Sequence, residues 1–569
     1  MAGAASVAAL SFLLIGSLVR FDPTVIAGGV FRQGNLPTGD NRVSLYYQDG
    51  RTATVSAHLG LAEGLVVLAT NGKPDASLSS RWMHDRRDTL PEVPIPTGRD
   101  FTMQVLAPII GLAYNPGASL VANIGHGSGM TAASLLTSSE IDRLVTIEIE
   151  PLMVEGSLVF MPANEGAFSD PRASFVFDDA KSYFAYRPER FDIVFAEPSN
   201  PWVSGTSSLF TVEFYRQVAE VLAPNGVLTQ WVHTYELNDD LFLTVISALN
   251  EVFPFYRAYL VGDGDLAIVA SRSPLADPDW SVLQTAAFRD FTRGAPPFEP
   301  QHVEALEVFD QGVLRALLAR GVRPNSDFHP VLDVGAERAR FARTWAEGVR
   351  AMTAARVDLT RYFRDRPGPP RPYVLPPSKG LLPLVRTERA SWLRQVLASG
   401  GGVAPDEYPE WQEELVVLKD FLLLTRGEAS IANWGIWVSM FVRVESTLHW
   451  GTWGFVDPVF YGTVFEMLGR EEIPGEGRAV VDLLHGYSLG DWPRVAAAVD
   501  VLLDPVARGE RWFPADVLLA LAAVSYLEVG RAGDARTAVD RLVPRTGWDE
   551  SHLRRGILEA MVDEASGGD

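Results

Sequence analysis

Short apolar segments alternate with helix-length segments between Ser119 and Ser271. In chain order the apolar segments are SLVANIG, RLVTIEIE, SFVFDD, FDIVFAEP, GVLTQWV and DLAIVAS. This alternation predicts βαβ units, which build a mostly parallel sheet with helices on both faces. Ligands of such sheets bind beyond the carboxyl ends of the strands. The residues that follow each strand are therefore the first candidates for a functional site.

Other patterns flank this region. Period-two alternation with Gly, Asn and Asp turns predicts a small antiparallel sheet over about residues 42–77, and residues 101–114 have a helical pattern. PNSDFHPVLD, which ends at Asp333, predicts a last extended segment, and beyond about Ala336 strand patterns largely disappear.

The C-terminal part follows a proline-rich linker, PGPPRPYVLPPSKG, and has helical patterning rich in Trp and Leu. LLHGYSLGDWPRVAAAVD and AVSYLEVGRAGDARTAVD are related at a spacing of 40 residues. They predict helix hairpins of the tetratricopeptide kind, although simple helical packing gives the same pattern. The predicted parts are an apolar helix (1–30), a small β domain (31–100), a Rossmann-like domain (101–335), a proline-rich linker (336–380) and an α-helical, tetratricopeptide-like domain (381–569).

Composition excludes several classes of function. The 569-residue chain has a formal net charge of −22, which argues against a nucleic-acid partner. Because the chain has no cysteine, it has no disulfide, thiolate metal site or cysteine nucleophile. Its nine histidines show no metal-ligand spacing, so we expect no metal.

The N-terminus is apolar. Residues 2–19 carry no charge, and this length is barely enough to cross a bilayer as a helix. The basic region of a secretory signal is missing. A membrane helix, a buried or partner-docked helix and a signal peptide all stay open.

A glycine-rich loop, NIGHGSGM, ends the first strand of the alternating region. Gly125, Gly127 and Gly129 allow a sharp turn and a close approach to a ligand at the start of the next helix. Glycines also gather at ordinary strand-to-helix turns, so this signal alone is weak.

Acidic residues at the ends of the next two strands strengthen the signal. Glu148 can accept both ribose hydroxyls of an adenosine, with Glu150 as the competing candidate. Asp178 and Asp179 can accept from an adenine amino group, which is typical of S-adenosyl-dependent transferases and not required by NAD; helix capping is the alternative. In this order the three signals predict a nucleoside-binding Rossmann-like site.

The turn FAEPSNPWVSG follows the fourth strand. Its prolines end the strand and stiffen the turn. Glu197 and Asn200 are therefore candidates for contact with a ligand.

Over about residues 30–271 the chain resembles the spermidine/spermine synthases, in particular a bacterial branch in which this domain follows a multi-helix membrane domain. The resemblance is carried by YYQDGRTATVS, NGKPDAS, DFTMQVL, IGHGSGMTAASLL, VTIEIEP, FDDAKSYF, FDIVFAEPSNPWVSG, LFTVEFYRQVAEVLAPNGVLTQW and GDLAIVAS. It implies an α/β chain with a Rossmann-like S-adenosyl transferase fold, a small N-terminal antiparallel β-sheet and a C-terminal helical, repeat-like domain. Residues 1–20 then resemble the last helix of a membrane domain, which implies the cytoplasmic face of the bacterial membrane; a soluble cytoplasmic protein is the alternative.

The resemblance also implies roles for single residues. The family transfers an aminopropyl group from decarboxylated S-adenosylmethionine to an amine, and Glu197 matches its base while Asn200 matches a substrate-binding acid. Gln104 matches a cofactor contact and Gln230 keeps its place after the fifth strand. The chain departs from the family at four positions. Ser128 stands for the Asp that holds the aminopropyl ammonium of the donor, Met103 and Val105 stand for a Tyr and a Glu of the segment that lines the amine pocket, and Asp75 stands for Gln.

Three hypotheses follow from these matches and departures. The first is an aminopropyltransferase-like enzyme whose amine is not putrescine. The second is a methyltransferase that uses intact S-adenosylmethionine. The third is a non-catalytic nucleoside-binding scaffold, with a membrane partner for the N-terminal helix and a protein partner for the C-terminal domain. The family resemblance also implies a homodimer.

Overall fold

The computed structural model describes residues 22–30, 41–85, 97–98, 100–186, 189–262, 264–295, 298–304, 306–319, 321–349, 382–405, 408–449, 456–550 and 552–566. The apolar segment of residues 1–20 and most of the proline-rich linker lie outside these ranges. Within them, none of the helices has the length and apolar character that a bilayer span needs. The same residues include no cluster of three His, Asp or Glu side chains suited to a metal ion.

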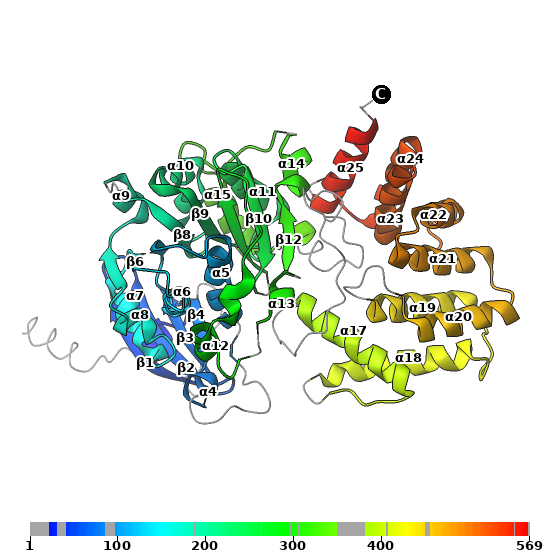
Figure 1. The fold of residues 1–569 in the computed structure, drawn as a ribbon, viewed down its shortest axis with the longest axis horizontal. Helices are drawn as coiled ribbons and strands as arrows, with labels where there is room; N and C mark the ends of the chain where they lie inside the picture. Colours follow the sequence, from blue (N-terminus) through cyan, green and yellow to red (C-terminus); the bar gives the residue numbers. More distant parts are fainter. Residues whose placement is uncertain are drawn as a thin grey trace, which may run out of the picture. The chain divides into compact units, whose positions relative to one another are not determined.

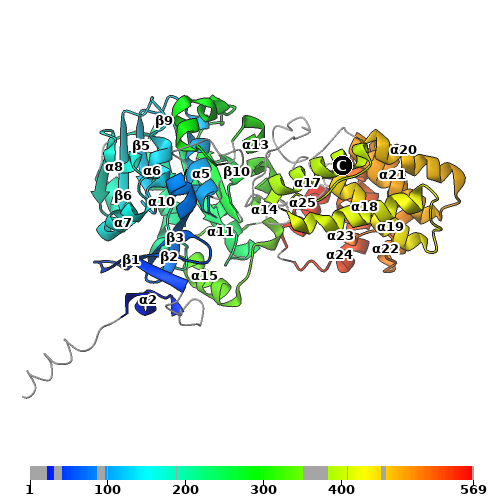
Figure 2. The ribbon, with the colours of Figure 1, turned by 90° about the horizontal axis from the view of Figure 1, so that it is seen from below.

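The N-terminal sheet is an antiparallel meander in the order β1-β2-β3-β4. A short helix, α2 (Pro23–Ile26), lies beside its edge strand β1 (Figure 2). Asn71 and Gly72 form the two-residue turn between β3 and β4, both with positive φ, as a tight hairpin requires. The four strands are β1 (Arg42–Asp49), β2 (Thr54–Gly60), β3 (Leu65–Thr70) and β4 (Lys73–Ser79).

The central sheet has eight strands in the order β12-β10-β11-β9-β8-β5-β6-β7 (Figure 1). Neighbouring strands from β9 to β7 pair in parallel, and β10 pairs antiparallel with β11 and β12. The strands are β5 (Leu120–Ile124), β6 (Arg143–Glu148), β7 (Ala173–Phe177), β8 (Phe191–Ala196), β9 (Leu222–His233), β10 (Phe255–Leu260), β11 (Asp265–Ser271) and β12 (Glu307–Asp310). The predicted fold class, an α/β Rossmann-like sheet with a small N-terminal sheet and a helical C-terminal region, is confirmed.

Helices connect the strands of the central sheet, and further helices come before and after these strands in the sequence. The predicted helix over residues 101–114 is α5, which is buried along almost its whole length. The helices of this region are α4 (Ser80–Asp85), α5 (Phe101–Tyr114), α6 (Met130–Leu135), α7 (Pro151–Gly156), α8 (Gly166–Ser169), α9 (Ala180–Ala185), α10 (Val212–Val221), α11 (Asp239–Asn250), α12 (Ala286–Phe291), α13 (Pro300–Glu304), α14 (Gln311–Ala319) and α15 (Val331–Ala342), with 3-10 turns at Ser157–Phe160, Thr206–Phe210 and Trp280–Gln284.

One predicted segment is wrong in part. PNSDFHPVLD was expected to be extended, but its only ladder contact in the described chain is an isolated bridge between Ser326 and His329. Helix α15 begins at Val331, directly after Pro330. Its buried residues, Leu332, Ala336 and Ala339, have helical spacing, so burial of this face favours a helix over a strand.

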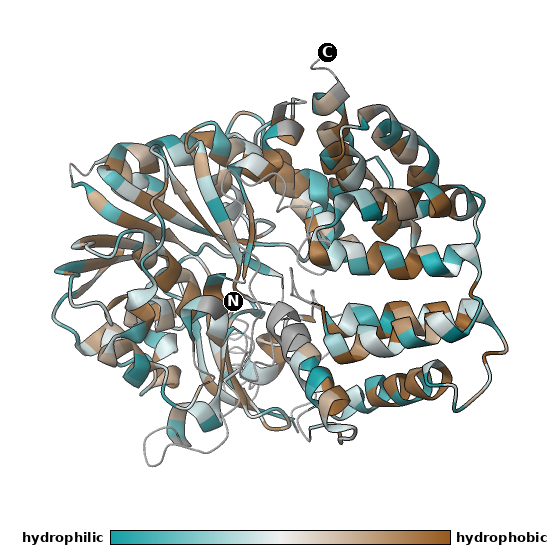
Figure 3. Cartoon of the chain, turned by 45° about the vertical axis from the view of Figure 1, so that its right-hand side comes forward, coloured by the Kyte–Doolittle hydropathy of each residue, from teal (hydrophilic) through white to brown (hydrophobic). Residues whose placement is uncertain are grey.

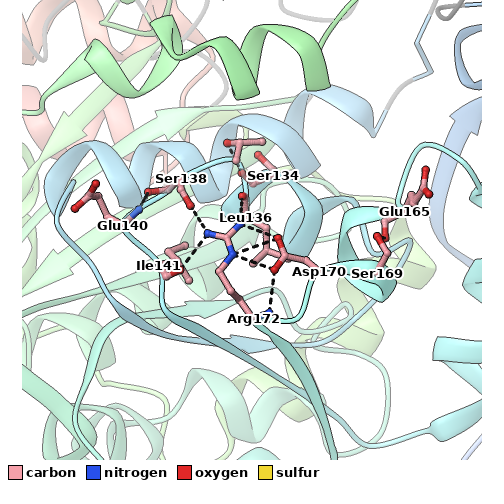
Figure 4. A network of polar contacts seen from close by, with 10 residues as sticks. Ser134, Leu136, Ser138, Glu140, Ile141, Glu165, Ser169, Asp170 and Arg172 are labelled. Carbon is pink, nitrogen blue, oxygen red and sulfur yellow. Dashed lines mark hydrogen bonds and ion pairs between the residues drawn. The ribbon is translucent and has the colours of Figure 1, made fainter.

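Arg172 fixes the connection that leads from α6 to β6 (Figure 4). Its guanidinium donates to the carbonyl oxygens of Leu136 and Ser138 at 2.6 Å each and of Ile141 at 3.0 Å. The same group pairs with Asp170 at 2.7 Å and holds the pKa of that carboxyl below its usual range. These bonds satisfy carbonyls that the end of α6 leaves without helical partners. They therefore hold the segment that follows α6, the helix at the end of the glycine-rich loop.

The C-terminal region is helical, and Figure 3 shows hydrophobic and hydrophilic residues along its helices. The two related stretches form the hairpins α21–α22 and α23–α24, and their buried residues join one hydrophobic core with α17 to α20. The helices are α17 (Leu382–Ser399), α18 (Gln412–Thr425), α19 (Trp434–Leu448), α20 (Pro458–Arg470), α21 (Gly475–Leu489), α22 (Trp492–Ala507), α23 (Ala515–Glu528), α24 (Ala532–Thr546) and α25 (Leu553–Ser566), with a 3-10 turn at Pro409–Trp411.

Asp239, the first residue of α11, forms hydrogen bonds that connect α11 to the start of α25. Its carboxylate accepts from the backbone N–H groups of Gly348 at 2.9 Å and Leu553 at 3.3 Å. Burial raises the pKa of Asp239, and these backbone bonds oppose the shift. The start of the last helix is thus anchored on a largely buried carboxylate and not only on apolar contacts.

Candidate active site

The glycine-rich loop joins β5 to α6 at the carboxyl edge of the sheet. Gly125 and Gly127 have φ values of 88° and 52°, which other residues rarely adopt. A Cβ on Gly125 would lie 2.7 Å from the carbonyl oxygen of Glu197, so the loop packs directly on the turn after β8. A Cβ on Gly127 would meet nothing within 4 Å, so the loop borders open space at this position. This space fits a ligand that approaches the backbone closely.

Glu148 lies at the end of β6 with its side chain buried. Its Oε2 accepts from the backbone N–H of His126 and its Oε1 from that of Glu150, both at 2.9 Å. Burial raises the pKa of Glu148, and these backbone bonds oppose the shift. Because each carboxylate oxygen has two lone pairs, both can still accept from a ribose hydroxyl.

Glu150 has a different role. Its Oε2 accepts from the N–H and hydroxyl of Thr52 at 2.7 Å, and its Oε1 accepts from the N–H of Leu152. It thus joins the N-terminal sheet to the start of α7. This leaves Glu148 as the better candidate for the ribose.

Asp178 and Asp179 follow β7; Asp178 is exposed and Asp179 is half-buried. Asp179 caps α9, because its Oδ1 accepts from the N–H of Ser182 at 2.9 Å. Asp178 accepts from the N–H of Asp179 at 2.8 Å. The capping interaction leaves the second oxygen of Asp179 at the strand end, where a ligand amino group could donate to it.

Ser128 and Gln104 contact each other. The Ser128 hydroxyl donates to Oε1 of Gln104 at 3.0 Å and accepts from the N–H of Met130 at 3.2 Å. Both side chains are buried, so this bond fastens the glycine-rich loop to α5. Met103 and Val105, the neighbours of Gln104 on α5, are also buried.

Glu197 is a second buried acid of the site. It directly follows β8, and the Thr131 hydroxyl donates to its Oε2 at 2.7 Å. Burial raises the pKa of Glu197 to about 7; the Thr131 bond opposes this shift and the charge of Asp100 adds to it. A carboxyl group with a pKa near the operating pH is suited to general base chemistry.

Two amide side chains lie near the ends of β8 and β9. Gln230 is buried, and its Nε2 donates to the carbonyl oxygen of Ala196 at 3.4 Å. Asn200 is 3% exposed, and its Nδ2 has no acceptor among the described residues. A buried amide without a partner is costly, so this group is suited to donate to a bound ligand.

Asp75 is bound by other residues of the chain. Its Oδ1 accepts from the ammonium of Lys73 at 2.6 Å and from the hydroxyl of Ser199 at 2.9 Å. Lys73 Nζ is also 2.6 Å from the Ser199 hydroxyl. Sequence reasoning missed Lys73, although residues two apart on a strand share a face, and this spacing could have indicated the pair.

These groups define a Rossmann-like α/β site with acids at the ends of β6, β7 and β8. Burial raises the pKa of two of these acids, Glu148 and Glu197. Residues 106–262 match the family model of the spermine/spermidine synthase domain. The matched segment includes the glycine-rich loop, Glu148 and Glu197.

Curated relatives support this assignment. The polyamine aminopropyltransferase of Caldicellulosiruptor bescii is 27% identical over 161 residues, which cover 28% of this chain and 58% of the relative. This chain thus spans little more than half the length of that relative. The enzyme of the same name from Moorella thermoacetica is 27% identical over 207 residues, 34% of this chain and 72% of the relative. Among solved structures, spermidine synthase from Thermotoga maritima aligns with a TM-score of 0.35 and 17% identity, over 55% of this chain and 87% of that one.

Proposed function

We propose that this chain is an aminopropyltransferase that moves the aminopropyl group of decarboxylated S-adenosylmethionine to an amine other than putrescine. The observation that carries the proposal is Glu197, a buried carboxyl with a pKa of about 7 at a strand end of the matched domain. Both reactants are cationic, and the amine must lose a proton to become a nucleophile. An anionic base at this position supplies both needs.

The proposed reaction is a displacement at carbon. The amine nitrogen bonds to the methylene carbon next to the sulfonium, the C–S bond breaks, and its electron pair stays on sulfur. Methylthioadenosine leaves, and Glu197 takes the proton that the amine gives up. Glu148 and Asp179 would accept hydrogen bonds from the ribose and the adenine, Gln104 would contact the donor, and Asn200 and Gln230 would orient the acceptor.

Methyl transfer from intact S-adenosylmethionine is a second candidate, favoured by Ser128. The resembling family has an aspartate at this position, which holds the aminopropyl ammonium. Ser128 supplies no charge, and its hydroxyl is bonded to Gln104. The extra carboxylate of the intact donor would therefore meet no repulsion from this residue.

A turnover assay separates the candidates. Purified protein is given each donor with a panel of amines, and the released nucleoside is identified by mass spectrometry. Methylthioadenosine supports aminopropyl transfer, whereas S-adenosylhomocysteine supports methyl transfer. Release of neither nucleoside with any amine would contradict both enzyme proposals and favour a nucleoside-binding scaffold. A membrane location of this scaffold through residues 1–20 would then be the next proposal to test.

A further inference from the structure

Lys73 is a buried cation at the end of the N-terminal sheet, beside the turn that carries Glu197. Its side chain is 6% exposed, and that of Asp75 is 11% exposed. The ammonium lies 2.6 Å from both the Asp75 carboxylate and the Ser199 hydroxyl. Ser199 is two residues beyond Glu197 in the same turn.

The carboxylate of Asp75 has no hydrogen-bonding capacity left for a substrate. Its Oδ1 accepts from Lys73 and Ser199, and its Oδ2 accepts from the N–H of Thr70 at 2.9 Å and from the Thr70 hydroxyl. A carboxylate accepts about four hydrogen bonds, and these four donors supply them all. Its charge is also cancelled by a partner at contact distance.

This network is linked to both acids of the site, Glu148 and Glu197. Ser199 links it to the turn of Glu197, and the charge of Asp75 adds to the raised pKa of Glu148. A second ammonium on the acceptor would need an anionic contact in this region. Here the Lys73 ammonium already occupies the anionic contact that Asp75 would offer.

We infer that Lys73 determines acceptor specificity, by taking the place of a second acceptor ammonium at Asp75. The inference rests on the proposed function, which places the reacting amine at Glu197. The acceptor class is then an amine whose remaining part is neutral or anionic. A diamine is disfavoured because its second cation would meet Lys73 and find the Asp75 carboxylate already bonded.

Binding to the protein saturated with methylthioadenosine tests the inference without turnover. The ligands are butylamine, γ-aminobutyrate and putrescine, which share a four-carbon chain and differ in the group at its far end. We expect the wild type to bind butylamine and γ-aminobutyrate about tenfold more tightly than putrescine. Lys73→Met frees the Asp75 carboxylate and should improve putrescine binding relative to butylamine by about tenfold.

The double variant Lys73→Met, Asp75→Asn is the matched control, because it removes both charges and should lose the gain for putrescine. If Lys73→Met does not fold, Lys73→Gln replaces it. The acceptor class can also be decided without a variant, from the relative affinities of the wild type for butylamine, γ-aminobutyrate and putrescine. Tighter binding of putrescine than of butylamine by the wild type, or an unchanged ratio in the folded variant, would overturn the inference. If the ratio shifts as expected but no amine gives methylthioadenosine in the turnover assay, the proposed function fails and the assignment of Lys73 stands.

Discussion

The carboxylates in the two halves of the candidate site have different partners. On the nucleoside side, Glu148 and Asp179 accept from backbone N–H groups, which leave the negative charge in place. On the amine side, Asp75 is paired with Lys73, which cancels its charge. The nucleoside side can therefore still accept hydrogen bonds from neutral hydroxyl and amino groups. On the amine side, Asp75 is not available to a cation of the substrate. Glu197 differs from both groups, because its charge depends on pH near neutrality.

Replacing the central acid should have the largest effect. Glu197→Gln keeps the size of the side chain and an acceptor for the Thr131 hydroxyl but cannot take a proton. Turnover should fall by about 10²–10⁴-fold, the usual contribution of a general base. The measurement is methylthioadenosine release, with unchanged methylthioadenosine binding as the control. A variant with the wild-type rate would remove Glu197 from the reaction.

Breaking the ion pair on the amine side should cost stability. Asp75→Asn removes the carboxylate that contacts the buried ammonium of Lys73, so the free energy of unfolding should fall by about 3 kcal/mol. Adding Lys73→Met to this variant should restore most of the loss, because no charge is then buried. Urea unfolding of the two variants measures both values. Equal stability of the single and double variants would show that the pair is not coupled.

Changes on the nucleoside side should weaken ligand binding. Glu148→Gln, which loses a charged acceptor for the ribose, should lower methylthioadenosine affinity by about tenfold to a hundredfold. Asp179→Asn should cost less, because one oxygen of its side chain is already used to cap α9. Glu150→Gln is the matched control: it weakens the bonds to Thr52 but should leave the affinity unchanged. If Glu150→Gln lowers the affinity more than Glu148→Gln does, the ribose contact belongs to Glu150 and the assignment of Glu148 is wrong.

The raised pKa of Glu197 also predicts how stability depends on pH. The folded protein holds this proton up to about pH 7, whereas an unperturbed carboxyl loses it near 4.5. The folded state therefore binds more protons between these values, and the contribution of this group to stability falls as pH rises through that window. Above pH 7, Glu197→Gln should be more stable than the wild type by about 1–3 kcal/mol, and below pH 4.5 the difference should vanish. Thermal unfolding at both pH values checks this; a constant difference would indicate another cause.

The sequence predicted the parts of the fold that local pattern determines. The apolar segments from SLVANIG to DLAIVAS correspond to β5, β6, β7, β8, β9 and β11, because short apolar runs bounded by turns are typical of strands. The strands β10 and β12 were not identified. FYRAYL mixes Arg and Tyr with apolar residues, and EVFD is only four residues long, so neither has a clear period.

The candidate site was predictable to the extent that it depends on strand ends. The glycine-rich loop, Glu148 and Glu197 follow their strands directly, so topology places them at one edge of the sheet. The partners of these residues were not predictable. Ser199 meets Asp75 across 124 positions of sequence, and Glu197 owes its raised pKa to burial, which only the assembled packing reveals.

The most direct test of the account is the pH dependence of turnover at saturating amine, in the wild type and in Thr131→Val. The variant removes the hydrogen bond that lowers the pKa of Glu197 and retains the carboxyl group. The account predicts a rate that rises with pH to a break near 7 in the wild type, and a break about one unit higher in the variant. Titration of the amine alone would give the same profile in both proteins. Identical profiles, or no break near neutral pH, would contradict the assignment of Glu197 as the base.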